Sequence, residues 1–280
     1  MILILARLVI SDGVGTATCS TVPGNSTDML SLLYFKRAIT NDPRQVLGSW
    51  NASIPHCKWE GVNCSLTHPG RITELNLAEQ GLSGPISPSL GNLTFLETLD
   101  LSTNSFTGEL PPLNSLHRLQ KLWLSENSLQ GIIPATLTNS SNLNSLYLSG
   151  NSLIGEIPLN IGLLSNQLEV IDLADNQLMG SIPNEIGQFP NLAVLLLGGN
   201  TLSGSIPTTL LNQSYLQILD LSTNMIGNTL PPNFGDTLPR LAWLTLDYNK
   251  FEGHIPASLG NISGLSTLDL SFNKLTAQVP

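Results

Sequence analysis

The feature that most constrains this chain is an internal repeat. The six residues LDLSTN occupy positions 99–104 and return at 219–224, which is 120 positions later. This interval equals five steps of 24, and the pattern LxxLxLxxNxLxGxIP fills every step and continues on both sides. A fixed period of about 20 to 50 residues is typical of stacked arrays. We therefore interpret the chain as a stack of similar units.

Nine units can be aligned, and the spacing of their leucines predicts how they stack. Leu99 and Leu101 are two positions apart, so on a strand both point to the same face. One such strand cannot bury its leucines alone, but stacked neighbours can, and each buried leucine contributes roughly 1.5–3 kcal/mol. We expect parallel strands in one concave sheet, with a single buried column formed by Leu99, Leu122, Leu146 and Ile171.

The asparagine after each strand is expected to turn the chain. Its amide can satisfy backbone groups inside the turn, and stacked asparagines would form a ladder. Eight units carry it, while the first unit carries Gln80. A glycine follows in most units and allows a left-handed backbone, for which Asn228 substitutes in the seventh. We interpret the asparagines and glycines as features of the fold rather than of function. The asparagines are Asn104, Asn127, Asn151, Asn176, Asn200, Asn224, Asn249 and Asn273.

A different block precedes the array. Thr27 or Ser26 can cap a helix near 28–39, and Asp42-Pro43 would end it. Cys57 and Cys64 are close in CKWEGVNC, and in a secreted chain such a pair indicates a disulfide. A zinc site is the alternative, but His56 and His68 are the only further ligands nearby. The block would close the open hydrophobic end of the array.

Both parts resemble plant leucine-rich-repeat receptor-like kinases and receptor-like proteins. The resemblance includes the xGxIP extension, D-x-x-x-L-L-x-F-K at 28–36, LGSWN at 47–51 and C-x-W-x-G-V-x-C at 57–64, and covers about 28–280. It implies an α/β fold, a right-handed leucine-rich-repeat solenoid shaped as a horseshoe. The solenoid would have about nine plant-type repeats and a small helical N-terminal cap closed by the disulfide.

The domain organisation follows from these segments. Residues 1–24, with the apolar MILILARLVI, are expected to be a weak or shortened secretory leader that contains the unpaired Cys19. Residues 25–70 would form the cap, and 71–280 the repeats, the last incomplete and without a C-terminal cap. The chain contains no run of 18 or more apolar residues, so no membrane-spanning helix is predicted in it. The chain is expected to end before the membrane helix and kinase of such receptors.

Composition and motifs exclude several functions. The net charge is −9 and the pI about 4.7, without a basic patch, so nucleic acid is not an expected partner. The four histidines are scattered, and no kinase motif set is present. Aspartates recur in one outward slot of the strands, but we expect them to be solvated rather than catalytic: Asp100, Asp172, Asp220 and Asp269. The chain is therefore predicted to be no enzyme and to need no cofactor or metal.

The outward side chains of the concave strands are the candidate binding site. Trp123 and Tyr147 are aromatic neighbours on adjacent units. Further along, an apolar strip is expected on a face that should be exposed to solvent. Exposed apolar patches of this kind often mark the surfaces that bind partners. The alternative explanation of the strip is that β-branched residues favour strands in general. The strip consists of Val170, Val194, Leu196, Ile218 and Trp243.

Seven N-x-S/T sequons make N-glycosylation a further expectation, with their register more informative than their number. Four occupy an equivalent slot after the convex turn, where glycans would leave the concave sheet open: Asn92, Asn139, Asn212 and Asn261. The other three precede the array or lie in the cap: Asn25, Asn51 and Asn63.

The leading hypothesis is an extracellular recognition module of a plant receptor-like kinase or receptor-like protein. By resemblance, it would bind a peptide or protein ligand on the concave face, together with a co-receptor that also has leucine-rich repeats. It would be secreted into the apoplast or associated with the plasma membrane as part of a longer receptor. The alternatives are a soluble inhibitor of secreted cell-wall-degrading enzymes, similar to polygalacturonase inhibitors, and a truncated product without independent activity.

Overall fold

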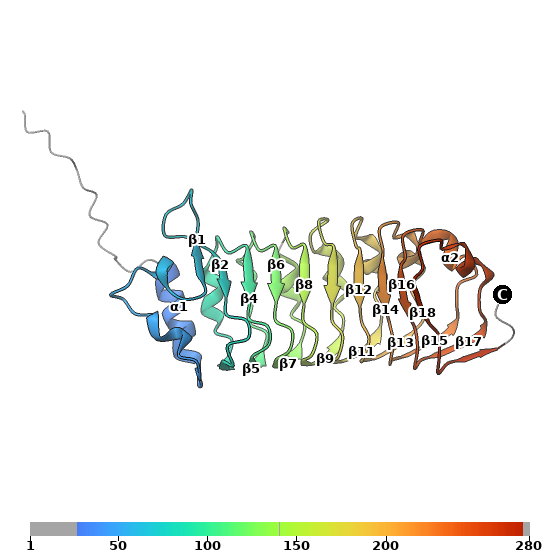
Figure 1. The fold of residues 1–280 in the computed structure, drawn as a ribbon, viewed down its shortest axis with the longest axis horizontal. Helices are drawn as coiled ribbons and strands as arrows, with labels where there is room; N and C mark the ends of the chain where they lie inside the picture. Colours follow the sequence, from blue (N-terminus) through green and yellow to red (C-terminus); the bar gives the residue numbers. More distant parts are fainter. Residues whose placement is uncertain (1–26, 140, 277–280) are drawn as a thin grey trace, which may run out of the picture.

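The computed structural model describes residues 27–139 and 141–276. The expected leader at 1–24, Cys19, Ser26 and Asn25 lie outside these residues. The described chain forms an elongated solenoid with one strand from each coil on either side (Figure 1). The predicted leucine-rich-repeat fold is therefore confirmed.

The first sheet is the predicted concave sheet. It has ten strands, and all neighbours are parallel except β1 and β2. The strands in spatial order are β1 (Val62–Cys64), β2 (Ile72–Asn76), β4 (Thr98–Asp100), β6 (Lys121–Trp123), β8 (Ser145–Tyr147), β10 (Val170–Asp172), β12 (Val194–Leu196), β14 (Ile218–Asp220), β16 (Trp243–Thr245) and β18 (Thr267–Asp269).

A second sheet, which the sequence analysis did not predict, lies on the other side of the coils. Its first strand follows Gln80, and the other eight follow the ladder asparagines. In chain order they are β3 (Ser83–Pro85), β5 (Ser105–Glu109), β7 (Ser128–Ile132), β9 (Ser152–Glu156), β11 (Gln177–Ser181), β13 (Thr201–Gly204), β15 (Met225–Thr229), β17 (Lys250–His254) and β19 (Lys274–Thr276).

Short helices connect the second sheet back to the first. The helix α1 (Thr27–Ala38) belongs to the cap, and α2 (Phe234–Thr237) lies in the seventh repeat. Prolines of the IP pairs, such as Pro158 and Pro207, directly precede 3-10 helices. The 3-10 helices are η1 (Val46–Ser49), η2 (His56–Lys58), η3 (Pro88–Asn92), η4 (Ala135–Asn139), η5 (Leu159–Leu163), η6 (Asn184–Gln188), η7 (Thr208–Asn212) and η8 (Ala257–Asn261).

The core is the expected aliphatic column. Leu99, Leu122, Leu146 and Ile171 are register partners on consecutive strands, and each is fully buried. The column continues through Leu195, Leu219 and Leu244. Its continuity explains why each coil depends on its neighbours for burial.

The asparagine ladder is also present. The Asn176 amide donates to the carbonyls of Leu173 and Ala174 in its own turn and of Leu148 in the preceding coil, at 3.0–3.2 Å. Its Oδ1 accepts from Leu153 N at 3.0 Å. The same pattern recurs at Asn200 and Asn224. Each asparagine thus joins two coils as well as closing its own turn.

The residue before each ladder asparagine has a left-handed backbone, which the sequence analysis missed. Gly150 and Gly199 adopt this conformation without strain, but non-glycine residues do so in the other repeats. Two of them are aromatic: Tyr248 and Phe272 have φ near 50° and stack with ring centroids 4.1 Å apart. In the eight coils with a ladder asparagine, the hydrogen bonds of that asparagine hold this turn.

The expectation of solvated aspartates was wrong for two positions. Asp100 and Asp172 are only 6% and 7% exposed. Their carboxylates accept hydrogen bonds from the turn after the strand: Asp100 Oδ1 from Ser102 N, and Asp172 Oδ1 from Ala174 N. Asp220 and Asp269 accept the same turn hydrogen bond but are only half-buried, so the burial of Asp100 and Asp172 depends also on their neighbours, which a polar outward slot alone does not reveal.

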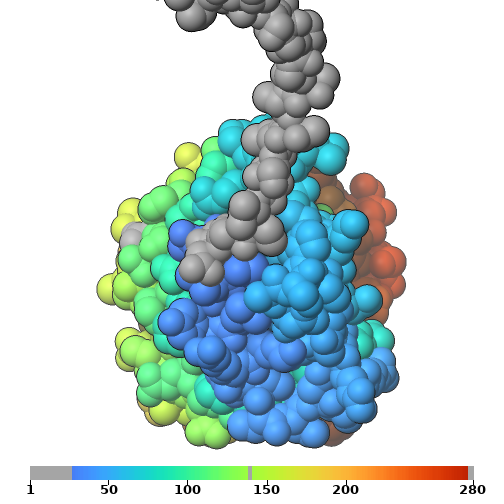
Figure 2. Space-filling model, turned by 90° about the vertical axis from the view of Figure 1, so that its left-hand side faces the viewer, coloured from blue at the N-terminus to red at the C-terminus, as the bar shows by residue number. Residues whose placement is uncertain are grey.

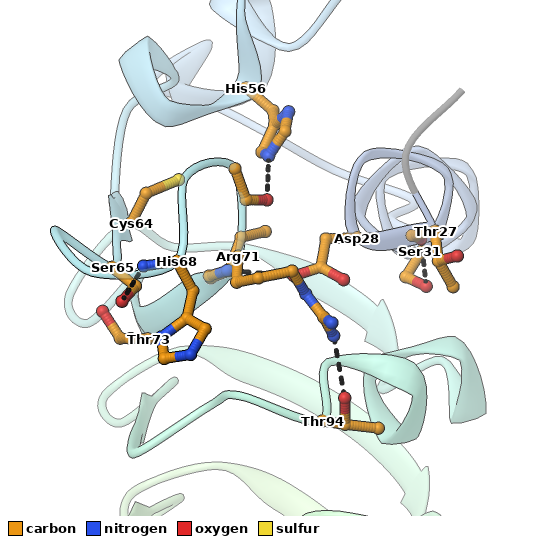
Figure 3. Close-up of polar contacts among 12 residues, drawn as sticks. Thr27, Asp28, Ser31, His56, Cys64, Ser65, His68, Arg71, Thr73 and Thr94 are labelled. Atoms are coloured by element: carbon orange, nitrogen blue, oxygen red, sulfur yellow. Dashed lines mark hydrogen bonds and ion pairs between the residues drawn. The ribbon is translucent and has the colours of Figure 1, made fainter. Parts of the chain in front are cut away.

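The cap closes the N-terminal end of the array, as Figure 2 shows in end view. Trp50 and Trp59 are buried and stack with ring centroids 5.4 Å apart. The buried Asp28 carboxylate of α1 accepts from Arg71 Nε and from Ile72 N at the start of β2 (Figure 3). Arg71 continues to Thr94 in the next coil. These contacts attach the cap to the first two coils.

No helix in the described ranges is long and apolar enough to cross a bilayer.

Candidate functional site on the concave sheet

The predicted apolar strip is a continuous row on the concave sheet. Val170, Val194, Ile218 and Trp243 are successive register partners on β10, β12, β14 and β16. The three aliphatic side chains are half-buried against their neighbours, and Trp243 is 46% exposed. Their outward direction follows from strand alternation, since Leu195, Leu219 and Leu244 between the outward positions are buried.

Leu196 belongs to the adjacent outward column. Its register partners are Asp172 and Asp220. It therefore places one apolar side chain between two carboxylate positions. The column from Val170 to Trp243 is therefore apolar, and the column beside it carries an acidic residue on each side of Leu196.

Trp123 and Tyr147 form a separate aromatic pair on β6 and β8. They are register partners, and their rings meet edge to face with centroids 6.0 Å apart. Together with Ser102, Thr103 and Ser125 they line a hollow of about 380 Å³. Trp123 Nε1 is buried and has no hydrogen-bond partner among the described residues. The hydroxyl residues of this hollow were not predicted, because they lie outside the two outward columns of the strands from which the candidate site was read.

Several carboxylates near the strip influence each other. Burial raises the pKa of Asp172, with further contributions from the negative charges of Asp175 and Asp220. Burial also raises the pKa of Asp247, with Asp269 and then Asp220 adding to the effect. The Tyr147 pKa is raised by burial and by the nearby Asp172 charge. Burial is the largest cause in each case, and the charges of neighbouring aspartates add to it.

No basic side chain forms an ion pair with these carboxylates in the described part of the chain. The one ion pair found there joins Arg71 and Asp28 in the cap. Asp175 and Asp247 are thus further candidate binding residues beside the predicted strip. The sequence offered a signal for them, since both lie at turn positions that repeat with the period of the array.

The two cap cysteines are joined to each other, with Cα atoms 5.5 Å apart. His56 lies close enough to both sulfur atoms to resemble a metal-ligand set. However, disulfide sulfur atoms are not thiolates, and the thiolate is the form that binds zinc. His56 Nε2 is instead 2.8 Å from the carbonyl oxygen of Gly70 (Figure 3). The residues of this group therefore do not fit a zinc site.

The sequons lie where the register predicted. Asn92, Asn212 and Asn261 each end a 3-10 helix and are exposed, and Asn139 ends the equivalent helix η4. In the cap, Asn63 is exposed and Asn51 half-buried. The four equivalent positions are on the connections rather than on the concave strands. Glycosylation itself remains a prediction.

Comparisons with known proteins identify the family. A family model described as leucine rich repeat N-terminal domain matches residues 25–65. The leucine rich repeat model matches residues 95–115, 118–140, 142–164, 167–189 and 215–237. The crystal structure of the BIR2 ectodomain from Arabidopsis thaliana is 34% identical, with a TM-score of 0.54, over 62% of this chain and 92% of that chain. The chain belongs to the plant leucine-rich-repeat receptor family.

Other members of this receptor family are larger than the chain. The receptor-like serine/threonine-protein kinase EFR of Arabidopsis thaliana is 48% identical over 98 residues, which are 34% of this chain and 9% of EFR. The chain therefore spans only a small part of the curated relatives it matches. The Arabidopsis receptor kinase HAESA, in complex with the peptide hormone IDA and the co-receptor SERK1, is 31% identical. The similarity to HAESA covers 91% of this chain and 47% of that chain, with a TM-score of 0.73.

These similarities concern the extracellular part of the receptor family. The chain resembles a ligand-binding leucine-rich-repeat module and not the catalytic domain of a receptor kinase.

Proposed function

We propose that the chain is an extracellular recognition module of the plant receptor type, which binds a peptide or protein ligand on its concave sheet without catalysis. The observation that carries the proposal is the in-register apolar strip of Val170, Val194, Leu196, Ile218 and Trp243. Exposed apolar patches of this kind mark interaction surfaces, and tryptophan is a frequent anchor. The complex of HAESA with a peptide hormone supports a peptide as the ligand class.

The proposal includes the organisation and partners expected from the sequence. Residues 25–70 act as the cap, residues 71–280 as the recognition array, and residues 1–24 as the leader. The module works in the apoplast or at the plasma membrane as part of a longer receptor. A second leucine-rich-repeat protein serves as co-receptor, which the presence of SERK1 in the HAESA complex supports.

Binding by a solenoid of this kind needs no conformational change. The strip residues lie on strands, each held by register bonds to two neighbours, so the surface is already ordered before the ligand arrives. Preorganisation reduces the entropy lost on binding. An extended peptide would lie across the strands and contact one outward residue per coil, spaced about 4.8 Å apart.

The test is selection of ligands followed by matched substitutions. Random dodecapeptides displayed on phage are panned on the chain, and the recovered peptides are synthesised and titrated by calorimetry. We expect Ile218→Ser and Trp243→Ala each to weaken binding at least about tenfold. Ile132→Ser is the matched control, because Ile132 is 62% exposed on β7 of the second sheet. Equal affinities for all three variants would reject the concave strip as the binding surface.

A further inference from the structure

The aromatic pair of the concave sheet borders a hollow that lies outside the apolar strip. We call it the aromatic hollow; it has a volume of about 380 Å³ and is lined by Ser102, Thr103, Trp123, Ser125 and Tyr147. These residues come from three consecutive coils, which are spaced about 4.8 Å apart, so the hollow extends over roughly 10 Å. Its volume lies in the range of small-molecule sites, which combine an apolar wall with a few polar groups.

The two serine hydroxyls of the aromatic hollow can act only as acceptors towards a ligand. Ser102 Oγ donates its proton to Asp100 Oδ1 at 2.6 Å. Ser149 Oγ lies 2.6 Å from Asp172 Oδ2 and 2.9 Å from Ser125 Oγ. A carboxylate only accepts and a hydroxyl has one proton, so Ser149 donates to Asp172 and Ser125 donates to Ser149. The lone pairs of Ser102 and Ser125 remain for a donor group of the ligand.

One donor in the lining lacks an acceptor. Trp123 Nε1 is buried and has no hydrogen-bond partner among the described residues. Buried donors without a partner are rare because they are unfavourable, and here an acceptor from outside the chain would satisfy the indole N–H. The hydroxyls of Thr103 and Tyr147 make no hydrogen bond within the described residues either, and each can donate or accept. The aromatic hollow therefore requires an occupant that both donates and accepts.

The charges around the aromatic hollow favour a neutral occupant. None of its five lining residues is charged. The carboxylates of Asp100 and Asp172, which are buried behind the serine hydroxyls, oppose an anion. Lys121 Nζ lies 5.5 Å from the centroid of the Trp123 ring and opposes a second cation there. An ammonium group would also leave the indole donor unmatched, because it has no lone pair.

We propose that the aromatic hollow binds a neutral sugar residue. Each sugar hydroxyl can donate and accept, which matches a lining that needs both. The C–H groups of a sugar ring form an apolar face that can pack on the aromatic wall of the hollow. This wall consists of Trp123 and Tyr147, whose rings meet edge to face with centroids 6.0 Å apart. The inference goes beyond the proposed function, because the hollow lies on coils that precede the apolar strip.

A carboxamide group of a peptide is a poorer occupant. It also donates and accepts, but its polar atoms lie in one small planar unit, whereas those of the aromatic hollow are spread over three coils. The hydroxyls of a sugar project in several directions around the ring. With hydrogen bonds of about 2.8 Å at each end, they can contact Ser102 on one coil and Tyr147 two coils further on.

The experiment probes a glycan array with the labelled chain, followed by calorimetric titration of the sugars that bind. The array carries neutral cell-wall oligosaccharides of glucose and xylose, neutral glycopeptides with mannose, and charged oligogalacturonides. We expect binding to neutral sugars only. Binding of free oligosaccharides would identify the cell wall as the source of the sugar, and binding of glycopeptides alone would identify a glycosylated protein.

Tyr147→Phe removes one hydroxyl of the aromatic hollow and keeps the ring. This hydroxyl makes no hydrogen bond in the described chain, so the thermal midpoint should not change. The affinity for the sugar should fall about fivefold, which corresponds to the loss of one hydrogen bond. Tyr215→Phe is the matched control, because Tyr215 is 43% exposed and lies between η7 and β14, outside the concave strands. It should change neither quantity.

Trp123→Leu removes both the aromatic wall and the unpartnered donor while it keeps an apolar side chain on β6. We expect the sugar to bind at least about tenfold more weakly. Tyr34→Leu is the control, because it removes an aromatic ring that is 55% exposed on the cap helix α1. Unchanged circular dichroism confirms that each variant folds.

The outcomes separate the sugar site from the proposed function. The sugar site is overturned if no neutral sugar binds, if only oligogalacturonides bind, or if both variants of the aromatic hollow bind the sugar as tightly as the native chain. Panned peptides that need Trp123 would likewise overturn it if no sugar binds, and would assign the hollow to the peptide. In each of these cases, peptides that depend on Ile218 and Trp243 still support the proposed function. Peptides that do not depend on these two residues would reject the proposed function and leave the sugar site intact.

Discussion

Replacing one ladder asparagine tests the physical basis of the solenoid. Asn176 is only 8% exposed, and its amide serves three carbonyl oxygens while its Oδ1 accepts from Leu153 N. Asn176→Ala removes two N–H donors and one acceptor from a buried turn. At about 1 kcal/mol for each of the three hydrogen-bonding groups, we expect the free energy of unfolding to fall by about 3 kcal/mol. Unsatisfied buried carbonyls could make the loss larger.

The assay is urea unfolding followed by far-ultraviolet circular dichroism, combined with hydrogen exchange. Asn191→Ala is the matched control: Asn191 is exposed and donates one hydrogen bond, to the Asn166 carbonyl, so its loss should cost less than about 1 kcal/mol. Exchange of the Leu153 amide should accelerate in Asn176→Ala, because this amide loses its acceptor. If Asn176→Ala costs no more than Asn191→Ala and Leu153 stays protected, the ladder does not hold the coils together.

Three further predictions concern charge, the cap and the surface. Because burial raises the Asp172 pKa, its ionised form opposes folding at neutral pH. Asp172→Asn should therefore raise the free energy of unfolding, measured in urea at neutral pH, above that of the native chain. This gain should shrink as pH falls below the raised pKa, and a gain independent of pH would contradict the reasoning. Replacing Cys57 and Cys64 by serine should destabilise the cap by about 2.5 kcal/mol, from the entropy of its short closed loop, measured by hydrogen exchange in α1; unchanged exchange would show that packing alone holds it. Glycopeptide mass spectrometry of chain secreted from plant cells should find glycans at the equivalent sequons, and bare sites would remove that expectation: Asn92, Asn139, Asn212 and Asn261.

The sequence predicted the candidate site in part. Strand alternation was enough to place Val170, Val194 and Ile218 on the outward face, because a period of two leaves few alternatives once Leu195 and Leu219 are assigned to the core. The same argument placed Trp123 beside Tyr147. The sequence does not reveal that Asp220 packs over Gly198 and Asp175 over Gly199, because these contacts come from different coils.

The aspartates show why outward polar positions are hard to interpret from sequence. Asp100 and Asp172 occupy the same slot as Asp220, yet they are buried whereas Asp220 keeps one oxygen without a partner in the described chain. The difference depends on the neighbouring coils: Ser149 donates to Asp172 from the preceding repeat. At Asp172, burial among the coils raises the pKa, while the hydrogen bond from Ser149, about two dozen residues away in sequence, lowers it.

The sequence by itself determined the repeat, the aliphatic column, the asparagine ladder and the capped end, because each follows from a local pattern that every coil must satisfy in the same way. The tertiary structure decided what a single coil does not encode: the second sheet, the left-handed turns before the asparagines, and the packing of Asp220 over Gly198 from the neighbouring coil. Stacking brings together side chains from different repeats, so the shape and charge of the surface depend on which residues become neighbours across the coils.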